Sequence, residues 1–223
     1  MALIVASTID HTLLKPEATA DQVERLCEEA ARHGFAAVCV NPCWVTSVKA
    51  LLTKTLVKTC SVVGFPLGAA TTLTKEYEAR KAVGDGAHEV DMVINVGMLK
   101  SGMTLQLAHD MKSVRDAVPE PLILKVIIES AVLTNDEIRL ASKICMEQGA
   151  DFVKTSTGFH PSGGAKVEHV RLIKEIVGDK ALIKASGGIK NYTDVLKLIE
   201  AGASRIGTSS GVAIVEEAMR IQG

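Results

Sequence analysis

Two hydrophobic patterns alternate along the chain, and together they predict a fold of alternating strands and helices. Short runs rich in β-branched residues predict eight strands, at 7–10, 36–40, 59–64, 88–94, 121–128, 151–154, 181–184 and 204–208. Stretches with apolar residues at helical spacing predict eight helices, near 20–33, 42–54, 74–86, 101–117, 134–148, 165–177, 191–202 and 210–220. This count predicts an α/β fold, the TIM (β/α)8 barrel.

Glycine placement supports one repeated unit. Gly-Ala stands just before a predicted strand at 86–88, 149–151 and 202–204, and no linker or low-complexity stretch interrupts the pattern. We therefore expect a single domain over 1–223. The alternative is a doubly wound open sheet, which usually carries a glycine-rich fingerprint after its first strand. No G-x-G-x-x-G or Walker sequence is present, and the glycine-rich loops follow strands seven and eight, where TIM barrels commonly bind phosphate.

Composition narrows the possible partners. Lys and Arg number 25 against 26 Asp and Glu, and a net charge near zero argues against binding to nucleic acid or a membrane surface. No apolar run reaches the roughly 18 residues of a membrane span. The first residues lack the positively charged segment of a signal peptide. We expect a cytoplasmic protein that acts on small molecules.

The cysteines and histidines form no metal-binding pattern. The five cysteines are odd in number and irregularly spaced, which fits a reduced cytosolic protein better than a disulfide scaffold. Cys39 and Cys43 have no second ligand pair to complete a zinc site, and the six histidines are scattered. We expect neither a metal nor another cofactor.

Two lysines stand at the ends of predicted strands, each followed by small hydroxylated residues and glycine. Lys154 lies in DFVKTSTG at 151–158, and Lys184 lies in ALIKASGG at 181–188. A lysine is rarely buried on a strand unless it is paired or used. The C-terminal strand ends of a TIM barrel surround one mouth, and period-2 alternation turns Lys154, Lys184 and Asp91 inward.

Together these three residues predict a Schiff-base site. Lys154 would be the nucleophile, with its pKa lowered by the like charge of Lys184. Asp91 would shuttle protons while the carbinolamine forms and loses water. The ordinary alternatives are a Lys154 side chain that reaches solvent or pairs with a carboxylate, and an Asp91 salt bridge to a barrel lysine.

Two glycine-rich loops predict a phosphate site. They are SGG at 186–188 and GTSSG at 207–211. Glycines let backbone N–H groups approach an anion, and a helix N-terminus adds a favourable dipole. Turns need glycine in any case, but the two positions together predict phosphate contacts from Gly187, Gly188, Gly207, Ser209 and Ser210.

Four further residues lie near the predicted mouth. Asp10 ends the first predicted strand and could orient a polar substrate group or a catalytic lysine, or act as a cap or turn residue. Lys125 and Glu129 share one face of the fifth strand, which predicts a mutually neutralising pair inside the barrel. Cys39 ends the second strand, where a buried core cysteine is the ordinary state.

Eight motifs, in this order and at these spacings, resemble those of the deoxyribose-phosphate aldolases over nearly the whole chain. They are IDHTLLKP at 9–16, VCVNP at 38–42, VGFPLG at 63–68, EVDMV at 89–93, KVIIE at 125–129, FVKTSTGF at 152–159, KASGGI at 184–189 and IGTSSG at 206–211.

The resemblance implies a class I aldolase that reversibly cleaves 2-deoxy-D-ribose 5-phosphate into acetaldehyde and D-glyceraldehyde 3-phosphate, in deoxynucleotide catabolism. It implies Lys154 as the Schiff-base residue, with Asp91 and Lys184 as proton donors and acceptors. It also implies that the substrate pocket is lined by Asp10, Thr12, Cys39 and Thr155, with the phosphate at Gly187, Gly188, Ser209 and Ser210. Family members often form dimers or tetramers, so a homodimer or homotetramer is expected.

Two features depart from the family pattern. Some members have a lysine where this chain has Phe159, and some end in a tyrosine that helps proton transfer, whereas the tyrosines here are Tyr77 and Tyr192. Three other functions remain open. They are a transaldolase-like enzyme acting on ketose phosphates, a metal-free phosphosugar isomerase and a non-catalytic barrel that binds phosphometabolites.

Overall fold

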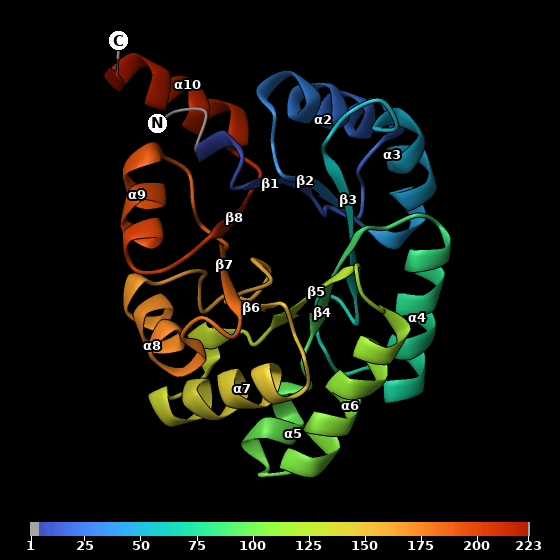
Figure 1. The fold of residues 1–223 in the computed structure, drawn as a ribbon, viewed down its shortest axis with the longest axis vertical. Helices are drawn as coiled ribbons and strands as arrows, with labels where there is room; N and C mark the ends of the chain where they lie inside the picture. The colour runs from blue at the N-terminus through green and yellow to red at the C-terminus, as the bar shows by residue number, and fades with distance from the viewer. Residues whose placement is uncertain (1–4, 223) are drawn as a thin grey trace.

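The computed structural model describes residues 5–222, which form a closed barrel of parallel strands surrounded by helices (Figure 1). The strands are β1 (Ile9–Leu13), β2 (Ala37–Val40), β3 (Lys58–Val63), β4 (Glu89–Val93), β5 (Ile123–Ile127), β6 (Phe152–Lys154), β7 (Leu182–Ser186) and β8 (Arg205–Thr208). Each strand pairs with the next in sequence, and β8 pairs with β1 to close the ring. The predicted TIM barrel is therefore confirmed.

The helices form the outer layer in Figure 1. They are α2 (Ala20–His33), α3 (Val45–Leu51), α4 (Thr72–Gly84), α5 (Val96–Lys100), α6 (Thr104–Ala117), α7 (Asn135–Glu147), α8 (Val167–Val177), α9 (Tyr192–Glu200) and α10 (Gly211–Gln222), with short 3-10 turns η1 (Pro42–Trp44) and η2 (Ser130–Val132). Helix α10 packs against α2 and β1, which completes the ring. None of the helices in the described part of the chain has the length and apolar character needed to cross a membrane.

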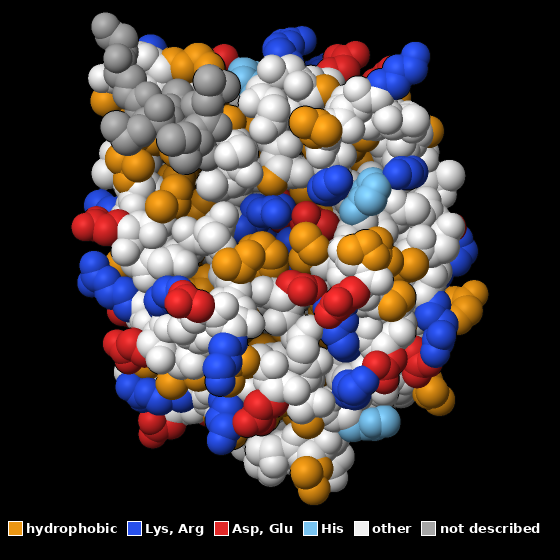
Figure 2. All heavy atoms as spheres, viewed as in Figure 1, with side chains coloured by type: hydrophobic (Ala, Val, Ile, Leu, Met, Phe, Trp, Pro, Cys, Tyr) orange, Lys and Arg blue, Asp and Glu red, His pale blue; other side chains and the backbone are white. Residues whose placement is uncertain are grey.

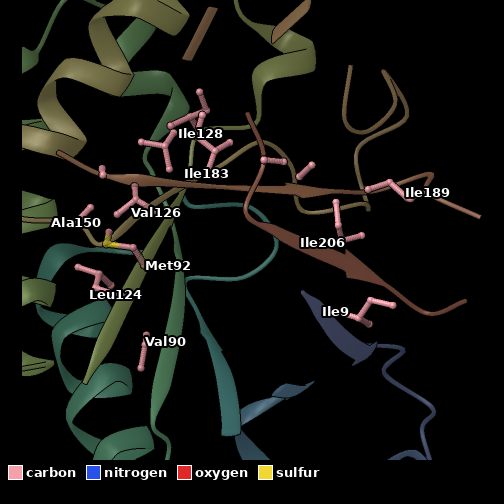
Figure 3. Close-up of a cluster of buried hydrophobic side chains, with 14 of the residues drawn as sticks. Ile9, Val90, Met92, Leu124, Val126, Ile128, Ala150, Ile183, Ile189 and Ile206 are labelled. Carbon is pink, nitrogen blue, oxygen red and sulfur yellow. The ribbon is translucent and has the colours of Figure 1, made fainter. Parts of the chain in front are cut away.

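Most of the hydrophobic core lies between the barrel and the helices. Val90 and Met92 of β4 belong to this cluster together with Leu107 and Met111 of α6, as the alternation along β4 predicts. Figure 3 shows this layer, with Leu124 and other branched aliphatic side chains extending from the strands. The opposite face of each strand points into the barrel, so that face is available for polar side chains.

Several element boundaries differ from those predicted by a few residues, and two of the differences change the description of the fold. The first strand begins at Ile9 and continues to Leu13, because pairing with β2 and β8 carries the polar residues after Ile9 into the sheet. The predicted helix 101–117 is preceded by α5, whose N-cap Asn95 accepts a hydrogen bond from the N–H of Met98. Side-chain capping of this kind stabilises a helix too short to show a clear apolar repeat.

Candidate active site

Charged side chains fill much of the barrel interior. They come from six strands and comprise Asp10, Glu89, Asp91, Lys125, Lys154, Lys184 and, at its partly buried edge, Arg205. Basic and acidic side chains are visible together near the centre of the face in Figure 2. Buried charges are costly unless they are paired and hydrogen-bonded. The contacts of these groups therefore decide what the site can do.

Asp91 is the centre of this network. Its Oδ2 atom lies 2.7 Å from the Nζ atoms of both Lys154 and Lys184, and its Oδ1 atom lies 2.7 Å from Nζ of Lys125. Burial alone would raise the pKa of Asp91, but the three lysines outweigh burial and hold it well below its usual range. At neutral pH Asp91 is therefore a carboxylate that joins three amines.

Lys184 is held as a cation. It contacts the carboxylates of Asp10 and Asp91 and is fully buried. Burial would lower the pKa of Lys184, but these two carboxylates outweigh burial and raise it above its usual range. Lys154 and Lys184 lie opposite each other in the register of the adjacent strands β6 and β7, so the positive charge of Lys184 is next to Lys154.

Lys154 differs from its neighbours in its access and its partners. Its Nζ atom contacts one carboxylate, Asp91, and the residue lines a cavity, whereas Lys125 and Lys184 each contact more than one carboxylate. Three carboxylates in this cluster face four basic side chains, which leaves one positive charge in excess. Lys154 is the amine of this cluster that lines the cavity, so a carbonyl compound bound there could react with it.

A second layer of ion pairs lies below these groups. Lys125 contacts Glu89 at 2.6 Å, and Arg205 contacts Asp10 at 2.6 Å and Glu89 at 3.2 Å. The predicted pairing of Lys125 with Glu129 is wrong. Strand β5 ends at Ile127 and the backbone of Glu129 has a φ of 53°, so the alternation that placed both side chains inside does not reach Glu129.

The cavity at the mouth has a volume of about 370 Å³ and brings Lys154 together with the two glycine-rich loops. All five predicted phosphate residues line it: Gly187, Gly188, Gly207, Ser209 and Ser210. Helix α10 begins at Gly211, directly after the second loop, so the N-terminal end of its dipole lies at this wall. The cavity therefore offers a nucleophile at one position and an anion-binding wall at another.

Two glycines are required by close contacts around this wall. At Gly187, φ is 85°, and an added Cβ would lie 3.0 Å from Cα of Gly164 and 3.2 Å from Cα of Gly158. At Gly207, an added Cβ would lie 2.9 Å from Cβ of Ser186 and 3.0 Å from Cε of Lys184. A side chain at either position would force these neighbouring atoms to shift.

The residues expected to line the substrate pocket fall into two groups. Thr12 lines the cavity, as predicted. Asp10, Cys39 and Thr155 are fully buried and are not among its lining residues. Asp10 contacts Lys184 and Arg205, Cys39 stands beside Cys60 in the register of β2 and β3, and Oγ1 of Thr155 bonds the backbone of Ser186. Among the alternatives for Asp10, the structure matches orientation of a lysine.

Sequence reasoning did not find two cations on the cavity wall. Lys15 follows β1 and Lys190 follows β7, and both are exposed lining residues. Phe159, which replaces a lysine found in some family members, also lines the cavity and packs edge-on against Phe65 at 5.2 Å. The signal for Lys15 and Lys190 was their position directly after strands that end at the mouth. Tyr77 and Tyr192 do not line the cavity.

Two groups of side chains in the described chain have ligand atoms close enough to hold a metal ion. They are Cys39, Cys60 and Asp91, and Asp10, Cys60 and Glu89. In both groups the carboxylates already bond lysine or arginine, and burial holds the pKa of the Cys60 thiol well above its usual value. A metal would have to displace these ion pairs and ionise the thiol, so the donors fit the lysine network better than a cation.

Comparison with known proteins agrees with this chemistry. Residues 4–217 match the model of a family described as DeoC/LacD family aldolase. The chain belongs to the DeoC/LacD aldolase family. It is 52% identical over 212 residues to deoxyribose-phosphate aldolase 1 of Bacillus licheniformis, and the match covers 95% of each chain.

Solved structures of DeoC/LacD-type aldolases have the same barrel. A putative deoxyribose-phosphate aldolase from Coccidioides immitis superposes with a TM-score of 0.95 at 40% identity, covering 98% of this chain and 87% of that one. The deoxyribose phosphate aldolase of Aeropyrum pernix, described as having a unique tetrameric structure, gives a TM-score of 0.92 at 33% identity, covering 99% of this chain and 93% of that one. The relatives therefore match this chain over nearly its whole length.

Proposed function

We propose that this protein is a class I aldolase that reversibly cleaves 2-deoxy-D-ribose 5-phosphate to acetaldehyde and D-glyceraldehyde 3-phosphate. The observation that carries the proposal is the placement of Lys154, bonded to Asp91, in one cavity with two glycine-rich loops. An amine nucleophile and a phosphate-binding wall in one cavity fit a phosphorylated aldehyde. The names of the relatives, at about half sequence identity, support the same substrate.

The reaction begins at the Lys154 amine. Neutral Lys154 attacks C1 of the open-chain aldehyde, and Asp91 relays protons while the carbinolamine forms and loses water. The resulting iminium ion accepts the electron pair of the C2–C3 bond. The C3 hydroxyl gives its proton to a base, either Asp91 or a water beside it, and glyceraldehyde 3-phosphate departs. The remaining enamine is protonated at C2, and water releases acetaldehyde and regenerates the Lys154 amine.

Lys184 has two roles in this proposal. Its fixed charge beside Lys154 opposes a second positive charge, which favours the neutral amine that attacks the aldehyde. It also bonds the same Asp91 oxygen as Lys154 does, so proton transfers among the three groups need little movement. Asp10 holds Lys184 from the opposite side and keeps it directed at Asp91.

The phosphate would occupy the wall formed by the two loops. Backbone N–H groups near Gly187 and Gly188, the side chains of Ser209 and Ser210 and the N-terminus of α10 supply neutral donors. Lys15 and Lys190 would add the positive charge that Phe159 cannot provide. The two lysines therefore take the place of the family lysine at that position.

We also infer that the enzyme acts as a homodimer or homotetramer in the cytoplasm, within deoxyribonucleotide catabolism. Leu73 and Tyr77 of α4 are 76% and 69% exposed, and Leu105 of the adjacent α6 is 83% exposed. Apolar side chains grouped on neighbouring helices favour self-association, and the Aeropyrum pernix relative is described as tetrameric. Light scattering coupled to size-exclusion chromatography should give twice or four times the protomer mass, and a monomer at micromolar concentration would contradict the inference.

The five free cysteines support the cytoplasmic location, because cysteines remain reduced in that compartment.

Trapping of the imine tests the function directly. Borohydride reduction with acetaldehyde or deoxyribose 5-phosphate should leave a stable adduct on the peptide that contains Lys154, as measured by mass spectrometry. Lys154→Ala should abolish both the adduct and the turnover, because no other amine in the cluster lines the cavity. Lys174→Ala, a change at an exposed lysine on α8, is the matched control.

The same experiment separates the other candidate functions. Adducts with ketose phosphates in preference to deoxyribose 5-phosphate would favour a transaldolase-like enzyme. Binding of phosphosugars without any adduct would contradict Schiff-base chemistry and leave an isomerase or a binding protein.

A further inference from the structure

Glu129 is a strained and buried carboxylate that the proposed mechanism does not use. It is the non-glycine residue with positive φ in the part of the chain that the structure describes, with φ 53° and ψ 54°. A non-glycine residue in this left-handed region is strained, and the strain is maintained only where surrounding contacts hold the residue in that conformation. Its side chain is 4% exposed. Both features call for a reason at this position.

The carboxylate of Glu129 is bound by one residue, Thr157. The N–H of Thr157 donates to both carboxylate oxygens at 3.3 Å, and its Oγ1 donates to Oε2 at 2.5 Å. Within residues 5–222, no lysine, arginine or histidine forms an ion pair with Glu129. The hydrogen bonds of this buried carboxylate thus come from one backbone N–H and one hydroxyl, both of Thr157.

The segment that Glu129 holds joins the nucleophile to the cavity wall. Thr157 follows Lys154 by three residues, precedes Gly158 and lines the cavity. Two backbone bonds hold the same segment: the N–H of Ile128 donates to the carbonyl of Lys154, and that of Ser130 donates to the carbonyl of Thr155. Strand β5 ends before Glu129, and the left-handed conformation of Glu129 allows the residues on both sides of it, Ile128 and Ser130, to bond this segment.

The hydrogen bonds of the Thr157 hydroxyl decide whether it can donate to or accept from a ligand. A hydroxyl has one donor and two lone pairs. The donor is used on Glu129, and one lone pair accepts the N–H of Phe159 at 3.1 Å. One lone pair of the Thr157 hydroxyl remains free, and Thr157 lines the cavity. Toward a ligand in the cavity, this hydroxyl can therefore act only as a hydrogen-bond acceptor.

We propose that Glu129 is a positioning residue of the aldolase site, which orients the Thr157 hydroxyl as an acceptor for a hydroxyl group on the sugar chain. The inference rests on the proposed function, because it assigns the ligand as a hydroxylated, phosphorylated aldehyde. Acetaldehyde carries neither a hydroxyl nor a phosphate. Imine formation between Lys154 and acetaldehyde therefore needs no hydrogen bond to the Thr157 hydroxyl.

The test is a double-mutant cycle of Glu129→Gln and Thr157→Val, with Thr157→Ser as the conservative variant and Glu147→Gln, an exposed change on α7, as the control. An amide at position 129 can donate to Thr157 and occupy the lone pair that the carboxylate leaves free. Each single variant should lower kcat/KM for deoxyribose 5-phosphate by about tenfold or more. Thr157→Ser should keep activity within about threefold of wild type.

The double variant and acetaldehyde trapping decide the outcome. If Glu129 acts through the Thr157 hydroxyl, the double variant loses no more than Thr157→Val alone, within about threefold. Borohydride adducts of acetaldehyde on Lys154 should still form in every variant, with a much smaller loss of rate than the loss in kcat/KM for deoxyribose 5-phosphate. Losses that multiply in the double variant, or trapping lost together with cleavage, would overturn the positioning role. Failure of wild type to trap acetaldehyde would instead refute the proposed function.

Discussion

At the scale of single residues, the number of carboxylate partners gives equivalent lysines different roles. Lys154 and Lys184 are neighbours in register on adjacent strands, and both bond Oδ2 of Asp91. Of these two lysines only Lys184 also bonds Asp10, so Lys184 remains a cation, while Lys154 has one anionic partner and lines the cavity. One additional carboxylate thus separates the proposed electrostatic residue, Lys184, from the proposed nucleophile, Lys154.

Lys184→Leu tests this division of roles. The change removes the fixed charge beside Lys154 and leaves Asp10 and Asp91 without their shared buried partner. We expect kcat/KM for deoxyribose 5-phosphate to fall by about 100-fold or more, which is the scale of a lost general acid–base group. Stopped-flow trapping of the acetaldehyde imine should slow as well. Wild-type kinetics in Lys184→Leu would exclude Lys184 from the chemistry, and Lys174→Leu provides the control for loss of an exposed lysine.

Sequence periodicity found these residues where strands are regular and failed where they end. Alternation along β4, β6 and β7 placed Asp91, Lys154 and Lys184 in one interior, and the structure brings them into contact. The same rule failed for Glu129, because this residue lies beyond the end of β5 in a left-handed conformation and bonds Thr157 instead of Lys125. A backbone conformation of that kind in a non-glycine residue has no sequence signal.

At the scale of elements, the cavity is built from the loops that follow the strands. Motifs predicted the glycines of these loops, because close backbone approach limits the residues that fit. The burial of Cys39 is the ordinary state of a core cysteine and was expected from the sequence. The depth of Thr155 was not predictable, because it depends on the height at which β6 ends relative to its neighbours. Lys15 and Lys190 are the loop residues whose charge most directly concerns a phosphate.

The loop lysines give a prediction about phosphate recognition. Lys15→Gln and Lys190→Gln should each lower kcat/KM for deoxyribose 5-phosphate by about five- to tenfold, because a charge-assisted contact to phosphate is lost. Activity with unphosphorylated deoxyribose should not change, and the difference between the substrates should shrink at high salt. Initial-rate kinetics with both substrates make the comparison, with Lys54→Gln as an exposed control. Equal losses on both substrates would assign these lysines a structural role.

At the scale of the whole molecule, the barrel isolates four charged groups, Asp10, Asp91, Lys125 and Lys184, whose ionisation should hardly change near neutral pH. The pKa values of Asp10 and Asp91 are lowered, although burial opposes this, because lysines surround both carboxylates. The pKa values of Lys125 and Lys184 are raised, again against burial, by carboxylates. Lowered carboxyl pKa values contribute stability above the unfolded pKa of about 4, and raised lysine pKa values contribute it below about 10.4.

Asp91→Asn tests this network through the pH dependence of stability. The variant lacks the carboxylate whose stabilising contribution is complete above about pH 5 and is lost as pH falls through the lowered pKa of Asp91. We therefore expect a lower Tm than wild type, by an amount that is constant from about pH 5 to 9 and shrinks in more acidic buffer. Calorimetry across that range makes the measurement. A Tm difference that varied between pH 6 and 8 would mean that a group of the network titrates there, contrary to the ion pairs that surround Asp91.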